Sequence, residues 1–141
     1  MSDGRIAQVE VIIFKIIDEK PVFLLLKRQL HRGGFWQPVT GGVEKGEDLK
    51  ETALREMKEE TGIENYVEVL EDLHYFEFEA NGGHGWMKEY VFGVQVDEKT
   101  ESVISDEHSE QKWCSLDEAL DLLKYENNKV GFRKISYVIA A

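Results

Sequence analysis

The chain has little of the chemistry that stabilises secreted domains or builds thiolate metal centres. It contains one cysteine, Cys114, and two prolines among 141 residues. A single cysteine excludes an internal disulfide framework and a zinc site of several thiolates, so we expect a reducing, cytoplasmic location with Cys114 in the core. No apolar run approaches the roughly 18 residues of a membrane span, and no cleavable signal pattern follows Met1. The sequence therefore predicts a soluble protein with no membrane partner.

Basic residues are also scarce. Lys and Arg number 17 against 28 Asp and Glu, which gives a formal net charge of −11. Repulsion from phosphate backbones argues against a DNA or RNA polymer as the partner. A small phosphate compound can still bind if divalent cations mediate the contact. Hydrophobic residues make up 42% of the chain, and its length predicts one domain over residues 1–141.

The apolar pattern predicts strands and helices in a mixed order. A glycine-rich loop is expected at 81–85. The segments interleave without a strict βαβ rhythm, which favours an α/β (α+β) fold with a mixed sheet between helices. The expected strands cover 9–17, 22–26, 67–70, 73–79, 89–96 and 112–114, and the expected helices cover 48–61, 115–123 and 128–139.

Helix 48–61 carries the strongest chemical pattern. At helical periodicity Glu56, Glu59 and Glu60 fall within an arc of about 100°. Like charges this close repel one another unless something positive lies between them. A hard divalent cation, Mg²⁺ or alternatively Mn²⁺, suits such an oxygen cluster. Taken alone, the triplet is more typical of a solvated acidic helix face.

The context of the triplet resembles a known family. The 23 residues from Gly41 to Ile63 read GGVEKGEDLKETALREMKEETGI and match every fixed position of the Nudix box. This resemblance implies a Nudix-type fold with a loop–helix–loop catalytic motif, and Glu56, Glu59 and Glu60 as metal ligands. The Gly41 carbonyl is a further candidate ligand, because glycine lets the backbone approach the metal.

Three charged residues support or extend this motif. Glu47 lies near the helix start, opposite the metal face, where we expect it to hold the loop. Arg55 is four residues before Glu59 and within reach of its carboxylate. The general base varies across the family, between a box glutamate and a carboxylate on a later loop. Glu107 is the candidate loop carboxylate, as base or extra metal ligand, with Glu56 and a plain acidic turn as the alternatives.

The substrate pattern resembles dihydroneopterin triphosphate pyrophosphatases. The shared residues are 35–37, 39–41 and the downstream 107–108 and 112–113. The resemblance implies that Arg28 and Thr40 contact a triphosphate beside Gln37, and Trp36 could stack on a purine or pterin ring. Trp36 also fits a core position, and Arg28 a surface charge. Pro38 and Gly42 depart from this group, as does a longer loop before residue 35.

The leading hypothesis is a Mg²⁺-dependent Nudix pyrophosphohydrolase that cleaves a phosphoanhydride bond of a nucleoside or pterin triphosphate. A diadenosine polyphosphate or nucleotide-sugar hydrolase is the alternative within the enzyme class. A non-catalytic nucleotide-sensing module is the alternative of another class, although such modules usually lose box glutamates. A homodimer is compatible with the sequence. The four histidines are expected to have structural or incidental roles.

Overall fold

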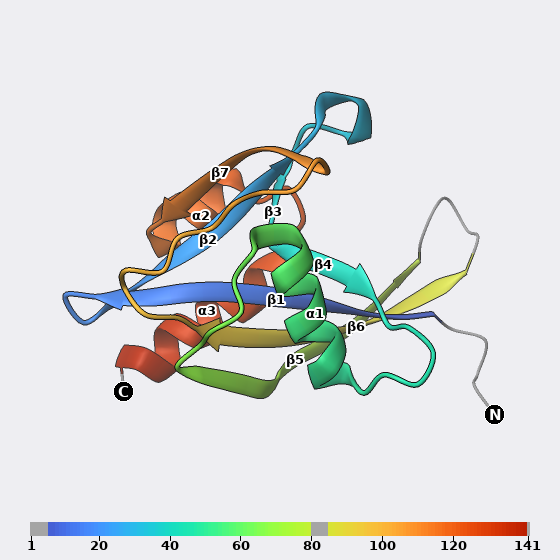
Figure 1. Ribbon diagram of the computed structural model, residues 1–141, viewed down its shortest axis with the longest axis horizontal. Helices are drawn as coiled ribbons and strands as arrows, with labels where there is room; N and C mark the ends of the chain where they lie inside the picture. The colour runs from blue at the N-terminus through green and yellow to red at the C-terminus, as the bar shows by residue number, and fades with distance from the viewer. Residues whose placement is uncertain (1–5, 80–84, 141) are drawn as a thin grey trace.

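A computed structural model describes residues 6–79 and 85–140, in which the strands form one seven-stranded mixed sheet (Figure 1). The strand order is β3-β2-β1-β6-β5, with β4 also paired to β1 and β7 to β2. The strands are β1 (Ile6–Ile17), β2 (Lys20–Arg28), β3 (Trp36–Gln37), β4 (Val39–Gly42), β5 (Glu68–Glu79), β6 (Trp86–Gln95) and β7 (His108–Cys114). The helices are the short 3-10 turn η1 (Leu30–Arg32), α1 (Leu49–Thr61), α2 (Leu116–Leu122) and α3 (Glu126–Ala140).

Strand β1 is the centre of the sheet. It pairs in parallel with β6 on one side. On the other side it pairs antiparallel with β4 along its first part, where Val11 is opposite Val39, and with β2 along its second part, where Phe14 is opposite Phe23. Both faces of β1 are covered. Val9 and its alternate neighbours belong to the hydrophobic cluster under α1, whereas Ile12 and Phe14 belong to the cluster under α2 and α3.

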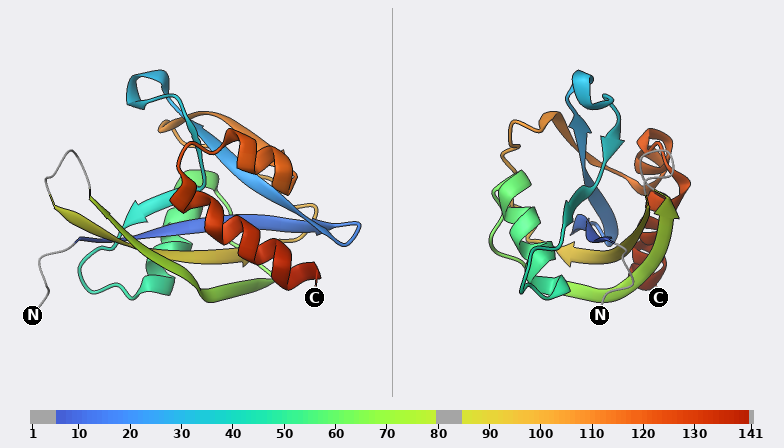
Figure 2. Two further views of the ribbon diagram at one scale, coloured as in Figure 1. Left: turned by 180° about the vertical axis from the view of Figure 1, so that it is seen from behind. Right: turned by 90° about the vertical axis from the view of Figure 1, so that its right-hand side faces the viewer.

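The helices form the outer layers of the fold. Figure 2 shows α1 on one side of the sheet and α2 and α3 on the other, as the sequence predicts. Helix α1 begins after Asp48, whose Oδ1 accepts the backbone N–H of Glu51 at 2.8 Å, and it ends at Gly62 with φ 73°. Helix α1 buries Ala53 and Met57 against the sheet. Within the described residues, no helix is both long enough and apolar enough to cross a membrane.

Several expected boundaries change in the structure. The expected strands 67–70 and 73–79 form one strand, β5, with an irregularity between Leu70 and His74 where Asp72 takes φ 55°. A strand can continue through such a bulge, which a gap in the apolar pattern does not show. Strand β7 begins at His108, because pairing with β2 extends it well before residue 112. The loop expected at 81–85 lies mostly outside the described residues.

Candidate active site

The guanidinium group of Arg55 joins the predicted motif together. Its Nε lies 2.6 Å from Oε2 of Glu47, and its Nη1 lies 2.7 Å from Glu56 and 3.2 Å from Glu59. Its Nη2 donates to the carbonyl of Gly42 at 2.9 Å. The guanidinium therefore fixes two α1 carboxylates and the preceding loop in one arrangement, and the contact expected between Arg55 and Glu59 is present.

Glu47 holds the loop between β4 and α1. Its Oε1 accepts the backbone N–H of Glu44 at 2.9 Å and the hydroxyl of Thr52 at 2.9 Å. The hydrogen bonds from Arg55 are the largest cause that lowers the pKa of Glu47 to about 2. Glu47 is thus an ionised anchor of the loop, as the sequence predicts.

Glu60 is a carboxyl group held in an unfavourable environment. Its side chain is buried, and its Oε2 has no hydrogen-bond partner among the described residues. Burial, the hydrogen bond with Glu56 and the negative charges of Glu56, Glu107 and Glu59 raise the pKa of Glu60 to about 10. The pKa of Glu56 is also raised, chiefly by burial. Such a cluster gains free energy when a cation neutralises it.

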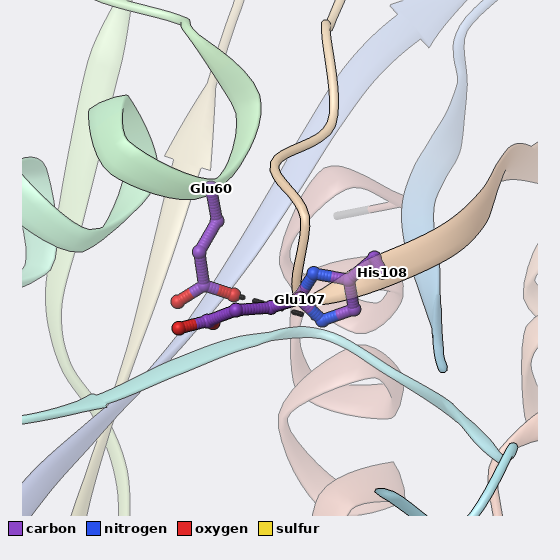
Figure 3. Close-up of side chains that lie close together, drawn as sticks. All are labelled: Glu60, Glu107 and His108. Carbon is purple, nitrogen blue, oxygen red and sulfur yellow. Dashed lines mark ion pairs between the residues drawn. The ribbon is translucent and has the colours of Figure 1, made fainter. Parts of the chain in front are cut away.

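The segment before β7 brings two more groups to this carboxylate. Figure 3 shows Glu60 reaching from α1 toward Glu107 and His108, and one ligand atom from each lies within 4.8 Å of the others. His108 Nε2 lies 3.8 Å from Glu60 Oε1 and 3.1 Å from Nε2 of Gln37. The arrangement therefore joins α1, β3 and the start of β7, and it contains the loop carboxylate that the sequence singled out.

His108 has a place here that the sequence did not predict. Its ring is buried, and burial lowers its pKa, which favours the neutral imidazole. Its Nδ1 has no hydrogen-bond partner among the described residues. A neutral imidazole and several carboxylates are donors that suit a divalent cation. The sequence signal for this role was the position of His108 directly after Glu107. The contact of His108 with Glu60 depends on the tertiary structure, so the sequence does not show it.

A cavity of about 530 Å³ opens beside this cluster. Arg28, Gln37 and Thr40 all line it, and Gln37 also contacts His108, so the cavity and the carboxylates adjoin. Trp36, for which the sequence left a stacking position and a core position open, packs against the apolar cluster under α2 and α3. Phe35 lines the cavity and forms an edge-to-face pair with Tyr125, the ring centroids 5.5 Å apart. Alternating strand geometry directs Trp36 and Gln37 to opposite faces.

Comparisons with known proteins agree with this geometry. The model of the NUDIX domain matches residues 7–134. A bis(5'-nucleosyl)-tetraphosphatase [asymmetrical] of Caenorhabditis elegans is 31% identical over 132 residues, covering 92% of this chain and 94% of that protein. A dihydroneopterin triphosphate diphosphatase of Haemophilus influenzae is 33% identical over 124 residues, covering 79% and 76%. An octanoyltransferase of Myxococcus xanthus is 33% identical over 103 residues, but the chain spans only 29% of that protein.

The three-dimensional comparison gives the same result. The crystal structure of a C. elegans Ap4A hydrolase binary complex superposes with a TM-score of 0.85 at 28% identity, covering 96% of this chain and 98% of that one. The loop–helix–loop, the sheet between helices and the carboxylate cluster thus occur together in one chain. This chain belongs to the NUDIX domain family and is a Nudix hydrolase.

Proposed function

We propose that this Nudix pyrophosphohydrolase acts on a nucleoside or pterin triphosphate with the help of Mg²⁺. The observation that carries the proposal is that the buried Glu60 cluster adjoins, through the contact between His108 and Gln37, a cavity that Gln37 and Arg28 line. The cluster supplies oxygen ligands for the metal ion. The cavity supplies the positive charge of Arg28 and aromatic walls. A substrate with an anionic phosphate chain attached to a flat ring is complementary to these groups.

The metal would be held by carboxylates from two segments. Glu56, Glu59 and Glu60 of α1 are the proposed ligands, joined by Glu107 and the Gly41 carbonyl. When bound, Mg²⁺, or Mn²⁺ in its place, would screen phosphate oxygens and lower the pKa of a water molecule. The buried Oε2 of Glu60, which has no partner among the described residues, supports this fit. Arg55 acts as a positioning residue because it fixes Glu56 and Glu59.

The substrate would lie along the cavity with its phosphates toward the cluster. Arg28 offers a guanidinium group to the phosphates, and its centre lies 5.4 Å from the ring of Phe35. Thr40 and Gln37 offer a hydroxyl and an amide on the same path. The similarity to a dihydroneopterin triphosphate diphosphatase supports a triphosphate with a heteroaromatic ring.

Glu107 is the proposed general base. Its side chain is exposed, unlike that of Glu60, so a water molecule can reach it. It lies beside Glu60 on the segment leading into β7. Glu56 is the alternative base, because its carboxylate is partly buried on the same cluster.

A diadenosine polyphosphate is the second candidate substrate. The C. elegans tetraphosphatase matches nearly the whole of this chain, and the Ap4A hydrolase structure superposes over almost all of it. The two candidates differ in the ring and in the length of the phosphate chain. We also propose a single domain over residues 1–141 and a cytoplasmic protein, with a homodimer to be tested by light scattering.

The decisive experiment incubates the purified chain with Mg²⁺ and a panel of triphosphates, diadenosine tetraphosphate and nucleotide sugars. We expect metal-dependent cleavage, with the products identified by ³¹P NMR. Glu60→Gln should lower turnover by about 10²-fold or more, because it removes a charge that the cation needs. Glu64→Gln is the matched control, since Glu64 is exposed and pairs with Lys58. Cleavage that is independent of metal, or unchanged in Glu60→Gln, would contradict the proposal.

A further inference from the structure

A row of side chains crosses three strands on the α3 side of the sheet. Gln8 of β1 is opposite Glu89 of β6, and Glu89 is opposite Phe76 of β5. Cross-strand partners share one face of a sheet, so the three side chains lie together. All three line the cavity described above. Glu10 lies two residues further along β1, on the same face of the sheet. The side-chain amide of Asn128, near the start of α3, donates to its Oε1 at 2.6 Å.

Glu89 is a buried carboxyl group without a cationic partner among the described residues. Its exposed fraction is 2%, and its Oε1 accepts a hydrogen bond from the side-chain amide of Gln8. Burial is the main cause that raises the pKa of Glu89 to about 7. Glu10 is also buried, and its Oε2 has no hydrogen-bond partner in the described part of the chain. Glu89 thus brings a buried carboxyl group to the wall of the cavity.

The walls around Glu89 suit a flat ring. Phe76 and Phe78 of β5 lie 5.9 Å apart between ring centroids, and Met87 of β6 lies opposite Phe78. All three line the cavity with Glu89. Apolar walls with one buried carboxyl are typical of sites that hold a ring by its faces and recognise it by one edge.

We propose that Glu89 selects substrates whose ring presents two adjacent N–H donors, the 2-amino-4-oxopyrimidine edge of guanine and pterins. Above about pH 7 the Glu89 carboxyl is ionised and has acceptors only, and its two oxygens then match two parallel donors. Adenine presents one donor and one ring nitrogen acceptor, and that acceptor would face a carboxylate oxygen. This inference rests on the proposed function and deepens it, because it names the ring.

The test measures binding without metal, so that it does not depend on turnover. Guanosine, inosine and adenosine 5′-monophosphates are titrated by calorimetry into the protein with EDTA at pH 8, where Glu89 is mostly ionised. We expect the wild type to bind the guanosine nucleotide at least about 10-fold more tightly than the adenosine nucleotide. Inosine lacks only the 2-amino group and should also bind about 10-fold more weakly than guanosine. This comparison needs no variant.

Substitution of Glu89 then tests the residue itself. Glu89→Gln presents one acceptor and one donor, which match the adenine edge, so the ratio of guanosine to adenosine affinities should fall to about one or below. Glu68→Gln is the matched control, because Glu68 is an exposed carboxylate on β5 at the end away from the cavity. It should keep the wild-type ratio.

Two results would overturn the inference. One is a wild type that does not distinguish the three nucleotides, and the other is a Glu89→Gln variant that keeps the wild-type ratio. Either result leaves metal-dependent hydrolysis intact as a separate measurement. Conversely, ring selectivity in EDTA with no hydrolysis in Mg²⁺ would reject the proposed function while supporting the role of Glu89.

Discussion

Gly41 lies against the carboxylate of Glu56 so closely that a Cβ at position 41 would be 1.9 Å from Oε2 of Glu56. The contact joins β4 to α1 at the place where the helix carboxylates gather. Real atoms cannot approach so closely, so any side chain at position 41 must displace Glu56. The first glycine of the motif is therefore a steric requirement of the carboxylate cluster.

Gly41→Ala should weaken Mg²⁺ binding and lower turnover by about 10²-fold, because it moves Glu56 from its place beside Arg55. Calorimetric titration of Mg²⁺ and steady-state kinetics would measure the two effects. Gly42→Ala is the matched control, since a Cβ there meets nothing within 4 Å. The steric explanation is wrong if both variants bind Mg²⁺ as the wild type does.

Arg55→Ala should lower turnover by about 10²-fold, because the carboxylates of Glu56 and Glu59 would no longer be held in position. The same change should lower thermal stability, because Glu47 loses the bonds that hold its loop. Arg55→Lys keeps the charge but cannot bridge Glu47, Glu56 and Glu59 together, so it should recover only part of the activity. Lys58→Ala, on the exposed face of α1, is the control and should change turnover little.

Metal binding should release about one proton per cation near pH 7. The raised pKa of Glu60, about 10, means that its carboxyl is protonated in the free protein at that pH. A cation needs the ionised form, so Mg²⁺ affinity should rise with pH. Titration calorimetry in HEPES and in Tris, whose ionisation enthalpies differ, counts the protons. Proton release in a Glu60→Gln variant equal to that of the wild type would assign the proton to another group.

Glu107→Gln distinguishes three roles for the loop carboxylate. A general base predicts a loss of turnover of about 10²- to 10⁴-fold with the Michaelis constant nearly unchanged. A metal ligand predicts a loss that higher Mg²⁺ or Mn²⁺ largely restores. We expect the first pattern. Kinetics across a metal titration separate the cases, and turnover within error of the wild type would move the base to Glu56.

Glu89 should make the protein less stable as pH rises. Its pKa is about 7 when folded, against an ordinary value of 4.5, so the folded state binds the proton more tightly. Its contribution to stability is therefore full below about pH 4.5 and is lost as pH rises through about 7. Glu89→Gln does not titrate and should be more stable than the wild type at pH 8, by at most about 3 kcal/mol.

Urea denaturation at pH 5 and pH 8 would measure this difference. Glu68→Gln, an exposed carboxylate on β5, should follow the wild type at both values. A Glu89→Gln variant whose stability falls between pH 5 and pH 8 as steeply as that of the wild type would assign the titration to Glu10 or Glu60 instead. Both of those carboxyls also have raised pKa values from burial.

Helix α1 and its ends could be predicted from local sequence. The expected helix 48–61 is α1 (Leu49–Thr61) in the structure, with Asp48 as the capping residue before it and Gly62 directly after it. Strand β5 could not be predicted as one element, since its continuity across Asp72 depends on pairing with β6. The start of β7 at His108 depends in the same way on β2. Strand limits are set by the partner strand, which a linear pattern does not contain.

The sequence by itself determined the family, the loop–helix–loop and the clustering of Glu56, Glu59 and Glu60, because helical periodicity is a local property. Only the tertiary structure decided that His108 and Gln37 adjoin that cluster, and that Phe35 rather than Trp36 lines the cavity. It also decided that Glu89 and Gln8, 81 positions apart, meet on one face. Such contacts arise from strand pairing between distant segments, so no local spacing encodes them.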